Sequence, residues 1–249
     1  MRLRRLAVGI LGAALVGAVP AALTATPAQA GAVPLKTGVG ATINAPAGGV
    51  YRYDQTIRFD GTVRRECTTG DTEFGCVPDA TDDSVTLFRR MKGSTRDRLI
   101  ATKEVGADGT FVFATASRGN AYYRIEYSGS PSLAYEASSV SGLIKGSRNP
   151  RGTAVITRQG AFYRGNVDPG WGRRSVTIQR KTCAADSCPW RAYKTVTTTR
   201  TGAYSAKIAV PRTGRLYWRS TVAPTSPQFV RAYGNPYYTA RARMAGAGR

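Results

Sequence analysis

Four cysteines are the residues best placed to do chemistry, and no histidine accompanies them. The missing histidine excludes a Ser-His-Asp triad, a Cys-His dyad and a histidine zinc ligand. The cysteines form two close pairs, with eight residues between Cys67 and Cys76 and four between Cys183 and Cys188. A Cys₄ zinc site is the metal alternative, but paired zinc ligands usually have two to four residues between them, which the first pair exceeds, and the two pairs lie over a hundred residues apart. We therefore expect two local disulfides, no free thiol, no metal and no cofactor.

The first 30 residues have the pattern of an export signal. Arginines at the N-terminus precede an apolar run, Leu6–Val19, that is too short for a membrane span of about 20 residues. Ala28 and Ala30 form a small-x-small cleavage site before Gly31. We expect a mature chain without a membrane segment, secreted or associated with the cell wall, where paired cysteines are oxidised. The pair Arg4-Arg5 leaves twin-arginine export open beside the general route.

The positive charge is concentrated in the second half of the chain. The whole sequence has 36 Lys and Arg against 15 Asp and Glu, for a net charge of +21. Residues 146–249 hold 19 of these basic residues and only two acids, Asp168 and Asp186, whereas residues 31–145 hold 14 basic and 13 acidic residues. A general bias toward arginine would affect both halves alike. The asymmetry therefore predicts a polyanion-binding surface in the second half. The leading candidates are Arg173, Arg174, Arg180, Lys181, Arg215 and Arg219.

Aromatic residues are interleaved with these arginines, as in Tyr217-Trp218-Arg219. Such a mixture can bind single-stranded nucleic acid or glycans by stacking. In a small β domain, however, most aromatic side chains fill the core. We expect this for Trp190, which follows Cys188 by two residues and could pack on that disulfide.

An acidic insertion surrounds the first cysteine pair. Six acids lie within residues 66–83: Glu66, Asp71, Glu73, Asp79, Asp82 and Asp83. Their spacing does not match a calcium-binding EF-hand loop, so a solvated loop is the favoured interpretation. Calcium binding and docking on the basic second half remain open alternatives.

The rest of the chain has the pattern of β-strands. Short runs of alternating β-branched and aromatic residues, such as Ser84–Arg89, are bounded by Gly, Pro, Asn and Asp, and no long helical period is present. The alternation in Ser175–Lys181 predicts that Val176 and Ile178 face inward and that Lys181 faces outward.

The pattern occurs twice, in the same order. Four short segments of the first copy match four of the second, among them Ser84–Arg90 with Ser175–Lys181 and Ala121–Arg124 with Leu216–Arg219. Each copy has the length and strand number of an immunoglobulin-like sandwich. We therefore predict an all-β chain of two tandem immunoglobulin-like (fibronectin type III-like) β-sandwiches, with a boundary at residues 146–150. The predicted division is a signal peptide at 1–30, sandwiches at 31–146 and 150–243, and a disordered tail at 244–249.

The second copy resembles a known family of repeats. A Gly-x-Val segment is followed by Val-Thr-Ile-Gln-Arg-Lys, by Trp-Arg-Ala-Tyr-Lys-Thr-Val at 190–196 and by Gly-Ala-Tyr-Ser at 202–205. This order is similar to that of the bacterial immunoglobulin-like repeats of secreted actinobacterial proteins. The resemblance implies a spacer, adhesin or accessory binding domain, and it brings no catalytic motif. The acidic insertion departs from the pattern.

These features predict a non-catalytic interaction module. Paired carboxylates for glycoside hydrolysis are scarce outside the insertion, and no Gly-rich phosphate loop precedes a helix. The predicted function is contact with an anionic cell-wall polymer or other polyanion through the basic second half. A purely structural spacer without a ligand is the alternative.

Overall fold

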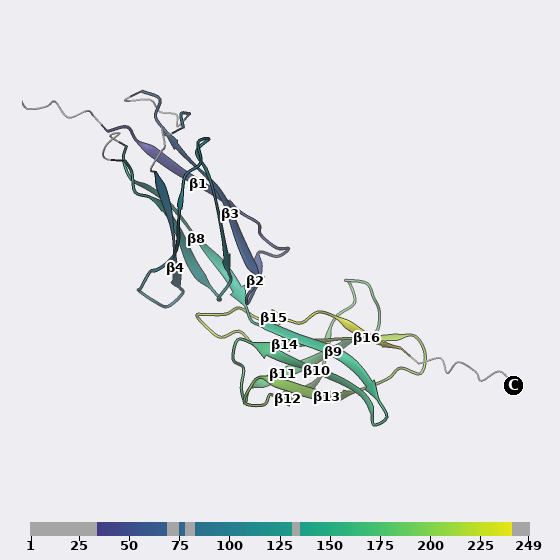
Figure 1. Ribbon diagram of the computed structural model, residues 1–249. Helices are drawn as coiled ribbons and strands as arrows, with labels where there is room; N and C mark the ends of the chain where they lie inside the picture. Colours follow the sequence, from purple (N-terminus) through teal and green to yellow (C-terminus); the bar gives the residue numbers. More distant parts are fainter. Residues whose placement is uncertain (1–33, 69–74, 78–82, 131–134, 241–249) are drawn as a thin grey trace, which may run out of the picture. The chain divides into compact units, whose positions relative to one another are not determined.

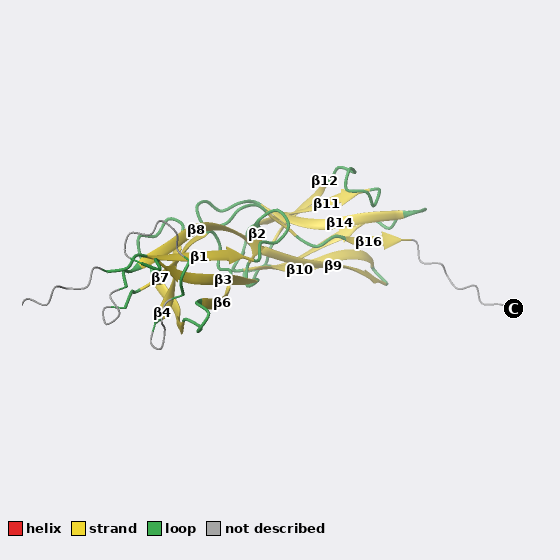
Figure 2. Ribbon diagram, turned by 90° about the horizontal axis from the view of Figure 1, so that it is seen from above, coloured by secondary structure: helices red, strands yellow, loops and turns green. Residues whose placement is uncertain are grey.

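The computed structural model describes residues 34–68, 75–77, 83–130 and 135–240. Strands and loops make up all of these residues, without a helix (Figures 1 and 2). The prediction of an all-β chain is therefore confirmed. The proposed cleavage residues Ala28, Ala30 and Gly31 and the tail at 244–249 lie outside the described residues.

Strands β1 to β8 form the first sandwich. One sheet has the order β1-β3-β6, and the other has the order β2-β8-β7-β4-β5. All neighbours are antiparallel except the short pair β2 and β8, which is parallel. The bounds are β1 Thr37–Ile43, β2 Val50–Arg52, β3 Thr56–Arg65, β4 Ser84–Met91, β5 Arg98–Glu104, β6 Thr110–Ala116, β7 Ala121–Tyr127 and β8 Ser138–Ser147.

Strands β9 to β16 form the second sandwich on the same plan. One sheet has the order β13-β10-β9, and the other has the order β12-β11-β14, with β15 and β16 both pairing with β14. The bounds are β9 Asn149–Thr157, β10 Gly160–Asp168, β11 Ser175–Lys181, β12 Arg191–Thr197, β13 Ala203–Ile208, β14 Arg215–Val222, β15 Ala232–Tyr233 and β16 Tyr237–Ala240. Three strands facing four or five is an immunoglobulin-like arrangement, so the chain has two tandem β-sandwiches.

Each sandwich has its own hydrophobic core, because alternate residues of every central strand point inward. In the first core Val85 and Leu87 of β4 are fully buried, and in the second Val176 and Ile178 of β11 are fully buried. Both pairs match the predicted inward positions. The tryptophan at the centre of the second core is Trp218, which is fully buried.

The sequence repeat extends to the details of strand pairing. The pairing of β4 with β5 shifts register between Leu87 and Phe88, and that of β11 with β12 shifts at the equivalent place after Ile178. Equivalent threonine pairs also meet across these strands, with Oγ1 atoms 3.1 Å apart for Thr86 and Thr102 and 3.3 Å apart for Thr177 and Thr195. These β-bulges fix which residues face outward in both copies.

The predicted boundary at residues 146–150 lies within strand structure. Strand β8 ends at Ser147 and β9 begins at Asn149, so Arg148 is the single residue between them. Its guanidinium lies over the rings of Trp171 and Phe229. Burial and the nearby charge of Arg174 hold the pKa of Arg148 below its usual range.

Candidate functional site

The outward face of the β12-β11-β14 sheet in the second sandwich carries the main concentration of cations and aromatic rings. Gln179 pairs with Arg219 across β11 and β14, and Lys181 pairs with Tyr217. Their neighbours in each strand, such as Ile178 and Trp218, are buried in the core. Because side chains alternate along a strand, the two pairs must point away from the core.

Seven side chains on this face form a continuous row of cations and rings, here called the cation–aromatic ladder. The guanidinium carbon of Arg219 lies 4.4 Å from the ring centre of Trp190 and 4.3 Å from that of Tyr233. The ammonium of Lys181 lies 5.1 Å from the ring of Trp190 and 5.8 Å from that of Tyr217. Tyr217 and Tyr238 are in ring contact, and Arg215 lies 4.6 Å over Tyr238. The ladder therefore comprises Tyr233, Arg219, Trp190, Lys181, Tyr217, Tyr238 and Arg215. Contacts of this kind stabilise by roughly 0.5–2 kcal/mol each.

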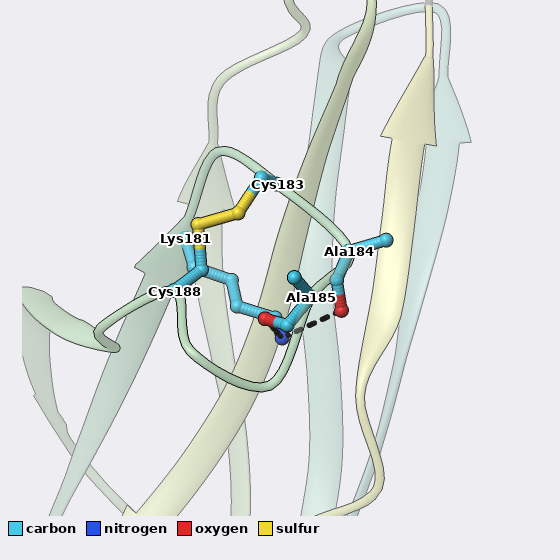
Figure 3. Close-up of a disulfide and its surroundings, with 5 residues drawn as sticks. All are labelled: Lys181, Cys183, Ala184, Ala185 and Cys188. Atoms are coloured by element: carbon cyan, nitrogen blue, oxygen red, sulfur yellow. Dashed lines mark hydrogen bonds between the residues drawn. A yellow bond between two sulfur atoms is a disulfide. The ribbon is translucent and has the colours of Figure 1, made fainter.

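The loop closed by the disulfide between Cys183 and Cys188 covers Lys181 and is hydrogen-bonded to it. The Nζ of Lys181 donates hydrogen bonds to the carbonyl oxygens of Ala184 at 3.1 Å and Ala185 at 3.0 Å (Figure 3). Both carbonyls lie between Cys183 and Cys188, which are bonded to each other with Cα atoms 6.1 Å apart. The Lys181 side chain is consequently buried although it points outward. This residue, predicted to bind a polyanion, instead holds the loop through its two hydrogen bonds.

Arg219 is held in a different way. The rings of Trp190 and Tyr233 both lie close to its guanidinium, and its Nε donates a 2.7 Å hydrogen bond to Oε1 of Gln179. Burial holds the pKa of Arg219 below its usual range. This geometry fixes the plane of the guanidinium and leaves its two terminal nitrogens for another acceptor.

The equivalent face of the first sandwich is arranged around carboxylates. By strand register, Arg124 of β7 corresponds to Arg219, and it lies over the ring of Phe88. Its NH2 atom contacts Oδ2 of Asp97 at 2.8 Å, and its NH1 atom pairs with Glu126. Arg90, the counterpart of Lys181, also lies within ion-pair distance of Asp97, at 3.8 Å. The cations of this face are thus neutralised within the chain.

The second sandwich lacks both acids. Thr221 takes the position of Glu126, two residues after the arginine in each copy. Trp190, the residue before β12, takes the position of Asp97, the residue before β5. Among the described residues of the second sandwich, the ion pair recorded is between Arg151 and Asp168 on another sheet, at 3.8 Å. The cations of the ladder therefore have aromatic neighbours and no internal carboxylate.

The predicted polyanion-binding residues do not form one group. Lys181, Arg215 and Arg219 belong to the ladder. Arg180 follows the opposite alternation, pairs with Trp218 across the strands and lies over the ring of Tyr193. Arg173 and Arg174 belong to the loop before β11, where Arg174 lies over Trp171.

Trp190 was expected in the core, and that expectation is wrong. Its side chain is only half-buried and lies in the ladder, between the cations of Lys181 and Arg219. Two further ladder members are Tyr233, which belongs to the interleaved run Arg231-Ala232-Tyr233, and Tyr238, which was not predicted. They lie on β15 and β16, strands too short to give a clear alternation.

Both predicted cysteine pairs are bonded. Cys67 joins Cys76 with Cα atoms 5.1 Å apart, and no cysteine is left free. Two acids of the insertion, Glu66 and Asp83, lie within the described residues, and both are buried and hydrogen-bonded. Glu66 accepts a hydrogen bond from the backbone N–H of Lys36, and Asp83 accepts one from the hydroxyl of Tyr127. The other four, Asp71, Glu73, Asp79 and Asp82, lie outside the described residues. Within the described ranges no three Cys, Asp or Glu residues gather as metal ligands would.

The part of the chain that is described contains no helix able to cross a membrane.

No protein-family model matches the sequence, and no curated protein matches it. Among solved structures, the chain is similar to the D0–D1 domain of intimin, with 12% identity, a TM-score of 0.28 and coverage of 82% of this chain and 97% of that one. It is similar to the BSP domain of a biofilm-associated protein, with 14% identity, a TM-score of 0.26 and coverage of 82% and 30%. It is also similar to a Salmonella alpha-2-macroglobulin, with 8% identity, a TM-score of 0.31 and coverage of 82% and 16%. Similarities at these low TM-scores support no inference about function.

Proposed function

We propose that this chain is an exported, non-catalytic interaction protein whose ladder face binds an anionic polymer. The observation that supports it is the contrast between equivalent faces of the two copies. The first face carries Asp97 and Glu126 beside its arginines, and the second carries Trp190 and Thr221 in their places. An acid supplied from outside would complete the second face as the internal acids complete the first.

Charge at longer range favours the same partner. Residues 146–249 hold 19 basic residues against two acids, and Asp168 is already paired with Arg151. A surface of this kind attracts polyanions and accelerates their association. The affinity of such contacts falls with salt because bound counterions are released.

Export is proposed on two features. The first 30 residues have the pattern of a signal peptide, and the four cysteines form two disulfides, which persist in oxidising compartments. A cell-envelope or extracellular site would also bring the ladder to anionic wall polymers. The resemblance to secreted actinobacterial repeats agrees with this location and with a non-catalytic role.

The proposal is tested by salt elution of the purified protein from immobilised heparin and teichoic acid. The double substitution Arg215→Gln with Arg219→Gln removes the two ladder cations that are not buried beneath the loop. The matched control is Arg96→Gln with Arg98→Gln, two exposed arginines of the first sandwich. We expect the ladder variant to elute at lower salt and the control to elute as the wild type. On a flexible single-stranded polyanion, the log–log salt slope should fall by about 0.7 per cation removed.

The alternative is a structural spacer in which the ladder only stabilises the sheet. The spacer would show no salt-dependent retention, or would lose it equally in both variants. Thermal unfolding of the variants provides the complementary measurement, because a purely structural ladder would lower stability without changing retention.

A further inference from the structure

We propose that Arg219 binds the carboxylate of an acidic polysaccharide, with the sugar rings resting on the exposed tyrosines of the ladder. This inference rests on the proposed function and names the class of polymer. It assigns the specificity to one guanidinium whose terminal nitrogens lie in a slot between two rings.

The first step is that Arg219 retains donors for a ligand. Its Nε is used by Gln179, while the rings of Trp190 and Tyr233 lie close to its guanidinium. Within the described residues, no carboxylate lies within ion-pair distance of it. A planar guanidinium in this state binds best edge-on, through two parallel hydrogen bonds from adjacent nitrogens.

The second step is the arrangement already present in the first sandwich. There Arg124, at the same register position, binds the carboxylates of Asp97 and Glu126 with its two terminal nitrogens. The same backbone therefore already positions an arginine for carboxylates. In the second sandwich the ligand would supply the carboxylate that the chain does not.

The third step concerns the shape of the slot. The ring centres of Trp190 and Tyr233 lie 4.4 and 4.3 Å from the guanidinium carbon. Trp190 precedes β12 and Tyr233 lies on β15, on the other side of β14, so the guanidinium of Arg219 lies in a slot between the two rings. A carboxylate is planar and can lie in the same plane as the guanidinium. Sulfate and phosphate groups are tetrahedral and direct oxygens out of that plane, toward the rings. The slot thus favours carboxylates over other anions.

The fourth step is the choice of a polysaccharide over an acidic peptide. Tyr233 is 42% exposed and Tyr238 is 54% exposed, one toward each end of the ladder. Exposed aromatic faces carry a negative quadrupole that attracts the C–H groups of a sugar ring. Exposed rings beside the cations of Arg219 and Arg215 match a polymer that carries carboxylates on flat sugar rings.

The experiment compares four probes at one salt concentration with the purified protein: polygalacturonate, its methyl-esterified form, dextran sulfate and poly-L-glutamate. We expect polygalacturonate to bind most tightly and the uncharged ester to lose binding. Arg219→Lys keeps the charge but loses the planar pair of donors, so it should weaken polygalacturonate binding about tenfold or more and dextran sulfate binding about twofold or less. Arg212→Lys, at an exposed arginine that precedes β14 and lies outside the ladder, is the matched control and should change both by about twofold or less.

A second variant keeps the test independent of the arginine. Tyr233→Leu removes one wall of the slot and should reduce the preference for polygalacturonate over dextran sulfate. Far-UV circular dichroism and thermal unfolding check that each variant is folded.

The outcomes separate this inference from the proposed function. If dextran sulfate binds as tightly as polygalacturonate, or Arg219→Lys affects both probes equally, the carboxylate slot is refuted while polyanion binding stands. Equal binding of poly-L-glutamate would overturn the polysaccharide assignment. If none of the charged probes binds, the proposed function itself fails.

Discussion

The hydroxyl of Tyr127 donates a 2.6 Å hydrogen bond to Oδ2 of Asp83, and both side chains are buried in the first sandwich. Burial, together with this bond and the charge of Asp83, raises the pKa of Tyr127 far above its ordinary value. Burial also raises the pKa values of Tyr51, Tyr123, Tyr163 and Tyr204. The neutral form of each phenol is therefore the one that the folded state accommodates.

The raised pKa values of these buried tyrosines predict that the protein loses stability at alkaline pH. A tyrosine in the unfolded chain ionises near pH 10. Below that pH both states hold the proton and stability is unaffected, whereas above it the unfolded state binds fewer protons and stability falls until the folded pKa is reached. Denaturant unfolding from pH 8 to 11.5 should show this decline. In Tyr127→Phe the decline should be shallower, and about 1–3 kcal/mol should be lost at neutral pH because Asp83 loses its donor. The exposed Tyr122→Phe is the control, and parallel curves for all three proteins would contradict the prediction.

Two equivalent glycines, Gly61 in the first copy and Gly165 in the second, lie where a larger side chain would not fit. Gly61 pairs with Phe111, whose ring lies where a Cβ would be. Gly165 pairs with Tyr204, and there the backbone carbonyl of Arg151 and the hydroxyl of Tyr204 both lie where a Cβ would be. Gly61→Ala and Gly165→Ala should each cost about 1–3 kcal/mol through overpacking, measured by chemical denaturation. Gly142, where an added Cβ would have no atom within 4 Å, is the control, and Gly142→Ala should change stability by about 0.5 kcal/mol or less. Equal effects at all three positions would contradict the close packing.

Because Lys181 holds the loop between Cys183 and Cys188, removing its ammonium group should destabilise that loop. Lys181→Met keeps the apolar stem but leaves the carbonyls of Ala184 and Ala185 without their donor, which should cost about 1–3 kcal/mol. Hydrogen exchange should accelerate at residues 182–189. Lys194→Met, a substitution at an exposed position of β12, should leave the free energy of unfolding and the hydrogen exchange of the loop unchanged. If the two variants behave alike, Lys181 does not hold the loop.

The contrast between equivalent faces predicts a gain of binding. Asp97→Asn with Glu126→Gln removes the carboxylates that neutralise Arg90 and Arg124. This variant should elute from immobilised heparin at higher salt than the wild type. Glu104→Gln with Glu136→Gln removes two exposed acids of the first sandwich that form no ion pair among the described residues, and it controls for net charge. A similar gain in the control would show that net charge, and not exposure of the arginines, governs retention.

Much of the fold could be predicted from the sequence because strand alternation and repetition are local patterns. Val176 and Ile178 were placed inward by alternation, and the tandem copies followed from matched segments in the same order. Proximity along the chain was enough to pair the cysteines.

The candidate site was harder to predict because alternation gives the face of a residue but not what covers it. Lys181 points outward as predicted, yet the disulfide loop buries it. Trp190 and Trp218 are equally apolar in sequence, and the register of β12 and of β14 against β11 decides which one enters the core. The slot around Arg219 depends on Tyr233, a residue of a two-residue strand that pairs with Thr221.

Burial of Trp218 in the second core gives the second sandwich an optical signal of its own. The chain has three tryptophans, Trp171, Trp190 and Trp218, and all of them belong to the second sandwich. Indole emission moves to longer wavelength when water reaches the ring, so the emission spectrum follows the unfolding of that sandwich alone. The first sandwich contributes only tyrosine emission. Trp190, with Lys181 and Arg219 near its ring, adds a fluorophore within the ladder that can respond when a polymer occupies it.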